Sequence, residues 1–183
     1  MSALWRDRAA SEAEDAVAGG VSGRRLLPMV WAHLDAVLAV EVRAYTFPWS
    51  RGNFVDSLAA GHVACVLLDV TGAVLGYFVA MRGADEIHLL NITVAPASQG
   101  RGHARVMIDA LLALCRAERV RELWLEVRTS NERARAMYER RGFVRVGLRK
   151  GYYPAAAGRR EDALLMSLKF DDAAPGEVND ALE

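Results

Sequence analysis

Two glycines separated by one residue, Gly100 and Gly102, join a strand-like segment to a helix-like one in QGRGHARVMIDALLALC, residues 99–115. At the entrance of a helix, glycine permits a tight turn. It also lets backbone N–H groups approach an anion at the positive end of the helix. The spacing therefore suits phosphate binding, and the alternative is a turn with a structural role only.

Two common phosphate-binding motifs do not fit these residues. A Walker loop ends in Gly-Lys followed by Ser or Thr, whereas this stretch continues from Gly102 as His103-Ala104. A dinucleotide-binding fingerprint needs its own six-residue glycine spacing within a βαβ unit, and an acidic residue about 20 positions later. Glu122 and Glu126 lie near that distance, but the spacing differs and the preceding strands look like a meander. Neither motif is therefore present.

A carboxylate and a phenol in the second half of the chain could move protons. Glu126 alternates with Leu125 and Val127 in LWLEVR, so a strand would place its carboxylate on the face opposite to theirs. There it could take a proton from an amine, or it could be an ordinary exposed strand residue near Arg128. Tyr138 follows on the next helix-like segment. It could return a proton to a thiolate, or it could be a core residue of its helix.

Hydrophobic periodicity predicts the elements that would position these groups. The expected order is a short strand, two helices, three strands, a helix, a strand, a helix and two strands. Ser50 can cap the second helix, and Thr129 with Glu132 fits a capping box at the start of the last one. The loop GYYPAAAGRR, residues 151–160, is expected to join the last two strands. This order predicts an α+β fold.

The composition is that of a soluble globular protein with one domain. The chain has 183 residues, of which 52% are hydrophobic and 25% charged. We expect the domain at 24–170, a flexible extension at 1–23 and an acidic tail at 171–183. The 23 Lys and Arg residues balance the 23 Asp and Glu residues, so no overall charge favours nucleic acid or an anionic membrane. No apolar run reaches the ~20 residues that span a bilayer, and no secretion signal is recognised, so a cytoplasmic protein is expected.

Gln99, Gly102 and Ala104, after a strand ending in NITVAP, resemble the pyrophosphate-binding motif of the GNAT superfamily of acetyl-CoA-dependent N-acetyltransferases. The resemblance extends over nearly all of the expected domain. Four further blocks, AYTFPWS, LWLEVRTSNERARAMYERRGF, RKGYYP and EDALLM, resemble the bacterial RimI-like group in the same order. Members of that group acetylate the N-terminal alanine of a small-subunit ribosomal protein. Two departures, Ala104 in place of the commoner glycine and a longer leader before Arg24, leave the chemistry untouched.

The resemblance implies a GNAT fold, a central mixed and mostly antiparallel sheet flanked by helices, with acetyl-CoA as co-substrate. The family's general base falls on Glu126 and its general acid on Tyr138, which implies direct transfer. Acetyl-CoA would lie between residues 92–94 of one strand and 123–127 of another. Contacts with it are implied for Ile92, Thr93, Val94, Gln99, Gly100, Arg101, Gly102, His103, Ala104, Arg105 and Asn131. Substrate contacts in the two loops that would flank the acceptor peptide are implied for Phe47, Trp49, Tyr152 and Tyr153.

Other acceptors and roles stay open on the sequence. The same fold could acetylate a lysine, a polyamine or a small-molecule amine, or it could bind acyl-CoA without catalysis. A solvated basic face, or a surface that attracts substrate or RNA, could form from Arg145, Arg149, Lys150, Arg159 and Arg160. The spacing of His and Cys residues suggests no metal site. We expect a monomer whose partner is the N-terminus of a ribosomal protein, with no specific nucleic acid and no membrane.

Overall fold

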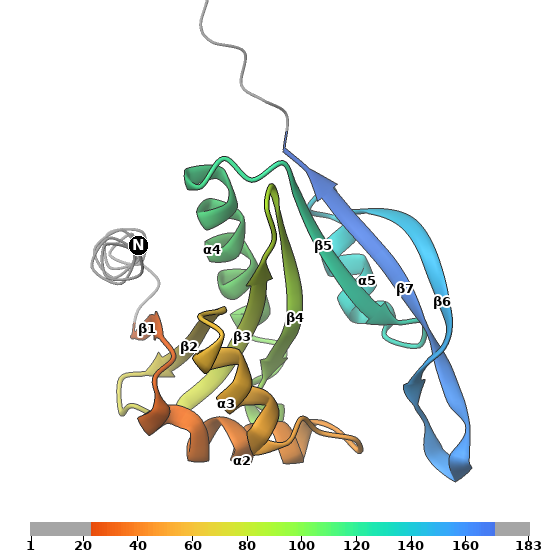
Figure 1. The fold of residues 1–183 in the computed structure, drawn as a ribbon. Coiled ribbons are helices and arrows are strands. Elements are labelled where there is room, and N and C mark those ends of the chain that lie inside the picture. The colour runs from red at the N-terminus through yellow and green to blue at the C-terminus, as the bar shows by residue number, and fades with distance from the viewer. Residues whose placement is uncertain (1–22, 171–183) are drawn as a thin grey trace, which may run out of the picture.

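The computed structural model describes residues 23–170, and in this part of the chain seven strands form one sheet, in the order β1-β2-β3-β4-β5-β7-β6 (Figure 1). The strands are β1 (Arg24–Pro28), β2 (Val63–Asp69), β3 (Val74–Arg82), β4 (Glu86–Val94), β5 (Glu122–Arg128), β6 (Val144–Pro154) and β7 (Arg160–Lys169). The helices are α2 (Leu34–Ala44), α3 (Arg51–Ala59), α4 (His103–Ala117) and α5 (Glu132–Glu139). Only β4 and β5 pair in parallel within this sheet of the described residues. The predicted α+β class, element order and mostly antiparallel sheet are confirmed.

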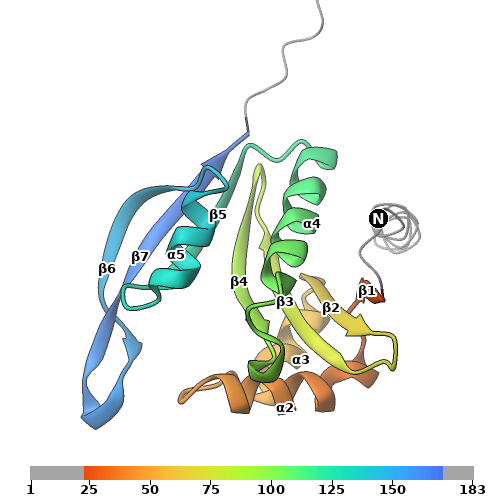
Figure 2. The same ribbon diagram turned by 180° about the vertical axis from the view of Figure 1, so that it is seen from behind.

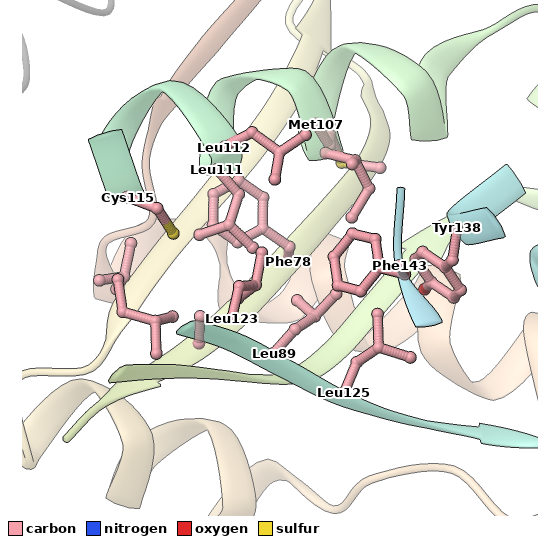
Figure 3. Packing of buried hydrophobic residues seen from close by; sticks show 14 of the residues in the cluster. Phe78, Leu89, Met107, Leu111, Leu112, Cys115, Leu123, Leu125, Tyr138 and Phe143 are labelled. Carbon is pink, nitrogen blue, oxygen red and sulfur yellow. The ribbon is translucent and has the colours of Figure 1, made fainter. Parts of the chain in front are cut away.

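Helices cover both faces of the sheet. Two opposite views place α2 and α3 on one face, and α4 and α5 on the other (Figures 1 and 2). α4 begins after Gly102 and buries one side, including Met107, Leu111 and Cys115, as expected for an amphipathic helix. The cluster beneath α4 and α5 continues to Tyr138 at the far end (Figure 3). This core fixes the helix that follows the glycine loop relative to the central strands.

A second buried cluster lies between the sheet and the pair α2 and α3. Its members include Leu34 and Val37 of α2, Phe54 of α3 and Tyr77 of β3. Ser50 begins α3 as predicted, because its Oγ accepts a hydrogen bond from the backbone N–H at the third helical position. The segment between these two helices is therefore held at both ends by regular structure.

β4 and β5 separate after a short stretch of pairing. Their parallel ladder runs from Glu86 opposite Glu122 to Leu89 opposite Leu125 and stops there. At the same place the pairing of β4 with β3 shifts by one residue, so Leu90 forms a bulge. Beyond it the two ribbons diverge (Figure 1). We call this region, residues 90–94 of β4 and 126–128 of β5, the β4–β5 splay.

Two local predictions were wrong. Thr129 does not cap α5, because its hydroxyl donates instead to Glu161 on β7, and Asn131 is the cap. The loop between the last strands is also shorter than expected, since β6 continues to Pro154. Its register with β7 shifts between Arg149 and Tyr153, which a local sequence pattern does not reveal.

Some predictions lie outside the described residues. These are the flexible extension, except for Gly23, and the acidic tail at 171–183. Among the helices between residues 23 and 170, none has the length and apolar character needed to cross a membrane.

Candidate active site

The glycine loop enters α4 in a conformation that side chains other than glycine rarely adopt. Gly100 has φ of 81° and Gly102 has φ of 79°, both in the left-handed region. Among the described residues, no hydrogen-bond acceptor is found for the backbone N–H groups of residues 100–105. These N–H groups lie at the positive end of a 15-residue helix. The loop can therefore bind an anion such as a pyrophosphate through its backbone.

The side chain of His103 turns away from this role. It is buried, and its Nδ1 accepts a hydrogen bond of 2.8 Å from the Arg24 guanidinium on β1. Burial, with the charges of Arg24 and Arg101, lowers the pKa of His103. The imidazole is thus neutral and fixes the start of α4 to the sheet, while its backbone N–H faces the loop.

The β4 side of the splay presents backbone groups that β5 does not pair. Ile92, Thr93 and Val94 are held by β3 on one side only. Tyr45, in the segment after α2, reaches across to this edge. Its hydroxyl lies 3.0 Å from Thr93 Oγ1 and 3.4 Å from the Ile92 carbonyl oxygen. An extended ligand could therefore pair with the free edge of β4, next to the Tyr45 hydroxyl.

The carboxylate of Glu126 lies on the β5 side of the splay. Its Oε1 is 2.7 Å from Nη1 of Arg149 on β6, whereas the nearby Arg128 pairs with Glu161. The Tyr153 hydroxyl donates to the backbone oxygen of Glu126 over 3.1 Å. The carboxylate also approaches the Tyr152 hydroxyl, and this contact raises the pKa of Tyr152. One carboxylate therefore faces the splay among two phenols and a guanidinium.

Tyr138 of α5 brings a third hydroxyl to this place. Its ring is buried against Phe143, with centroids 5.5 Å apart. Burial raises the pKa of Tyr138, and the neighbouring Tyr45 and Tyr153 add to the rise. The phenol therefore stays protonated at neutral pH and can donate a proton. Among residues 23–170 no hydrogen-bond partner is found for its oxygen, so the hydroxyl is available.

Asn131 and the end of β5 are fixed by a carboxylate that the sequence did not single out. Asn131 caps α5, because its side-chain oxygen accepts from the Ala134 N–H over 3.1 Å. Glu161 of β7 accepts from the Ser130 N–H over 2.7 Å and pairs with Arg128 at 3.0 Å. Burial alone would raise the pKa of Glu161, but the hydrogen bonds that it accepts lower it to about 2. The contacts cross from β5 to β7, so they could not be inferred from spacing along the chain.

The four predicted substrate residues lie on both sides of the splay but differ in exposure. Phe47 and Tyr152 are exposed, whereas Tyr153 is partly buried beneath the guanidinium of Arg128. The Trp49 ring packs against Phe54 of α3, with centroids 5.3 Å apart. Trp49 therefore anchors the segment between α2 and α3 to the core.

The basic residues of the last two strands have local partners. Arg145 pairs with Glu139 at 2.5 Å, and Arg149 pairs with Glu126. Arg160 donates to the carbonyl oxygens of Gly151 and Tyr152, which closes the turn between β6 and β7. Arg145, Arg149 and Arg160 thus support the site and its loop.

Comparisons with known proteins agree with this geometry. The model of the acetyltransferase (GNAT) family matches residues 34–143. The [ribosomal protein bS18]-alanine N-acetyltransferase of Haemophilus ducreyi is 33% identical over 134 residues, 73% of this chain and 92% of that protein. The enzyme of the same name from Escherichia coli is 36% identical over 135 residues, 74% of this chain and 90% of its own.

Solved structures show the same fold. The crystal structure of the ribosomal-protein-S18-alanine N-acetyltransferase from Escherichia coli has a TM-score of 0.77 and 34% identity. The match covers 85% of this chain and 97% of that one. Arabidopsis thaliana Naa50, in complex with the bisubstrate analogue CoA-Ac-MVNAL, has a TM-score of 0.70 at 18% identity and covers 81% of this chain and 99% of that one. At this low identity, the similarity to Naa50 shows a shared fold only.

Proposed function

The chain belongs to the GNAT family of acetyltransferases, and we propose that it acetylates the N-terminal alanine of the small-subunit ribosomal protein bS18. The relatives that carry this activity in their names match it over nine-tenths of their own length. The observation that carries the proposal is the β4–β5 splay, which combines a free edge of β4 with a carboxylate on β5 and a protonated phenol on α5. Acetyltransferase activity is common to the family. We propose the identity of the acceptor and the roles of the individual residues.

Acetyl-CoA fits the groups that the chain presents. The free N–H groups of residues 100–105 suit its pyrophosphate, and the left-handed glycines leave the loop backbone open to it. The free edge of β4 from Ile92 to Val94 suits the amide-bearing pantetheine arm. Asn131 uses its side-chain oxygen as a cap, which leaves its amide nitrogen for the cofactor. The bound thioester supplies the acetyl group, and everything else in the reaction is positioning and proton transfer.

Glu126 acts as the general base in this proposal. An α-amino group has a pKa of about 7.7–8.0, so near neutral pH a single carboxylate suffices to take its proton. The Glu126 carboxylate is partly exposed, and the guanidinium that accompanies it belongs to the even more exposed Arg149. A substrate ammonium can therefore take the place of that guanidinium.

Tyr138 acts as the general acid. The leaving thiolate has a conjugate acid with a pKa near 8.5 and is readily protonated by a phenol held in contact with it. Because burial raises the pKa of Tyr138, the hydroxyl carries its proton throughout the physiological range. Its position on α5, directly after β5, puts acid and base on consecutive elements of the chain.

A polyamine acceptor is a weaker alternative. Polyamines carry several positive charges and call for carboxylates along the acceptor groove. Neither TFPWS at 46–50 nor GYYPAAAGRR at 151–160 contains an acidic residue. The aromatic residues of these segments suit a peptide better.

The proposal is tested by CoA release from acetyl-CoA with two short peptides. One begins with the alanine of bS18, and the other is the same peptide with a blocked N-terminus and one free lysine. We expect turnover with the first peptide only. Turnover with the lysine peptide alone would leave the family assignment intact and overturn the proposed acceptor. Release with neither peptide, but with spermidine, would move the assignment to polyamines.

A further inference from the structure

A buried carboxylate that the proposed mechanism does not use lies beneath the acceptor side of the splay. Glu41 of α2 has only 1% of its surface exposed. Its Oε1 accepts the backbone N–H of Trp49 over 2.7 Å, and its Oε2 accepts the hydroxyl of Tyr77. The side-chain amide of Asn91 on β4 approaches the same Oε1, at 3.5 Å. Glu41 therefore joins α2, the segment before α3, β3 and β4 at one point.

This carboxylate fixes the orientation of the next groups in line. A carboxylate only accepts hydrogen bonds, so Asn91 must turn its Nδ2 towards Glu41 and its Oδ1 away. Oδ1 accepts from the Thr93 hydroxyl at 2.9 Å. The Thr93 hydrogen is thereby used, and Thr93 Oγ1 can only accept from its other neighbour.

That other neighbour is Tyr45. Its hydroxyl, 3.0 Å from Thr93 Oγ1, is therefore the donor in this contact. Its alternative partner, the carbonyl oxygen of Ile92 at 3.4 Å, also requires Tyr45 to donate. In either case the phenolic hydrogen points to β4, and the lone pairs of the oxygen point elsewhere. Burial raises the pKa of Tyr45, and Glu41 adds to the rise, so the group keeps its proton.

The free lone pairs lie where an amine would react. The Tyr45 oxygen is at the β4 edge of the splay, and it lies close enough to the hydroxyls of Tyr138 and Tyr153 to affect their pKa values. Tyr45 itself is 38% exposed, so part of the residue is open to solvent, while its hydroxyl is partly buried against Thr93. An attacking amine must aim its own lone pair at the thioester, and its N–H groups then need acceptors to the sides. Glu126 is one such acceptor, on the β5 side.

We propose that the Tyr45 hydroxyl accepts a hydrogen bond from the substrate's amino group, and that the buried Glu41 orients it for this role. Tyr45 is then a contact to the substrate, and Glu41 and Asn91 are positioning residues. The inference rests on the proposed function, since it concerns the amine that the enzyme acetylates. It places an acceptor, supplied by the segment after α2, at the β4 edge of the splay, where it complements the base on β5.

The test compares Tyr45→Phe with Tyr77→Phe, a matched loss of one hydroxyl from the same network. KM and kcat are measured separately for the alanine peptide and for acetyl-CoA, together with Tm. For Tyr45→Phe we expect a rise of about five- to tenfold in KM for the peptide, with KM for acetyl-CoA and Tm unchanged. Tyr77→Phe leaves Glu41 with one donor fewer in the core, so Tm falls, while KM for the peptide rises less than in Tyr45→Phe because the Tyr45 hydroxyl is kept.

Asn91→Ala tests the orientation itself. Without Asn91, the Thr93 hydroxyl is free to donate to Tyr45 and to occupy its lone pair. We expect KM for the peptide to rise although the phenol is intact, and the double variant with Tyr45→Phe to be no worse than Tyr45→Phe alone. Strictly additive effects would overturn the orienting role.

The two proposals fail in different ways. If wild-type enzyme does not turn over the alanine peptide, the proposed function is overturned and this inference falls with it. If wild-type enzyme does, but Tyr45→Phe keeps the wild-type KM for the peptide, only this inference is overturned.

Discussion

The guanidinium of Arg149 lies 2.7 Å from the carboxylate of Glu126, although the two residues belong to strands that are not neighbours in the sheet. The Arg149 side chain is 56% exposed and that of Glu126 is 22% exposed. Pairs this open contribute at most about 1 kcal/mol. If Glu126 is the base, as proposed, a substrate amine would have to displace this guanidinium, and the displacement would cost little free energy.

Arg149→Met should therefore not harm catalysis. The peptide then has no cation to displace. If the Arg149–Glu126 ion pair contributes about 1 kcal/mol, kcat/KM for the peptide should rise by up to about fivefold. Steady-state kinetics at low and high salt check this, because added salt should raise kcat/KM of the wild type and leave the variant unchanged. A loss of tenfold or more in the variant would show that Arg149 helps to bind the peptide.

Glu126→Gln should remove the base while keeping the site intact. We expect kcat to fall by about 10²–10³-fold at pH 7, with acetyl-CoA affinity by calorimetry within twofold of wild type. The deficit should shrink as the pH rises past about 8, because the α-amine then loses its proton to water. A protein that binds acyl-CoA without catalysis would instead show no turnover in the wild type either.

Tyr138→Phe should slow the reaction without loosening the fold. Only the hydroxyl is lost, so the ring still packs against Phe143 and Tm should remain close to wild type. Without a proton for the thiolate, kcat should fall by about 10²-fold. The raised pKa of Tyr138 means that the wild type should show no loss of activity from this group up to pH 9. An unchanged kcat in the variant would contradict the acid role.

Glu161→Gln should reveal a pH-dependent contribution to stability. The pKa of Glu161 falls from 4.5 to about 2 on folding, so its ionised form stabilises the fold above about pH 4.5. This contribution is lost as the pH falls from 4.5 towards 2. At pH 7 the variant should melt about 3–6 °C below the wild type, and the gap should narrow below pH 4.5.

Asp56→Asn is the matched control for this experiment, since it removes one carboxylate from the exposed surface of α3. Its Tm should follow that of the wild type at each pH. A constant gap for Glu161→Gln between pH 7 and pH 3 would contradict the assignment.

Gly76→Ala should disturb the end of β4. A Cβ at this position of β3 would lie 2.6 Å from the Thr93 carbonyl oxygen and 2.9 Å from Met107 Cε. Such overpacking costs about 1–3 kcal/mol, and the shift of β4 should raise KM for acetyl-CoA. Gly52→Ala is the control, because its Cβ would meet only Ser50 Oγ at 3.5 Å within a helix, where alanine stabilises. Equal stability of the two variants would refute the close approach.

Local patterns were sufficient for the element order and for the glycine loop. Both are set over short stretches, such as the alternation around Glu126 or the left-handed turns at Gly100 and Gly102. The partners of these residues were not predictable in the same way. Arg149 of β6 reaches Glu126 of β5 although β7 lies between these strands, and Glu161 of β7 accepts a hydrogen bond from the Thr129 hydroxyl, which follows β5.

The same limit explains why Glu41 escaped notice. In the sequence it is one acidic residue in an amphipathic helix, where an exposed position is the normal expectation. Its burial follows from three donors that arrive from the segment before α3, from β3 and from β4. The structural role of such a residue is recognised from the hydrogen bonds that it accepts, and these form only when the chain is folded.

The short ladder between β4 and β5 has a consequence for how the molecule responds to its ligand. Backbone pairing between β4 and β5 is limited to Glu86–Leu89 and Glu122–Leu125. The two halves of the sheet are therefore hydrogen-bonded to each other at one end only. An extended ligand bound along Ile92–Val94 would bridge the two halves at the other end. Backbone amides in the paired part of β4 and β5 should exchange slowly with and without ligand, whereas amides facing the open part should become protected only when the ligand is bound.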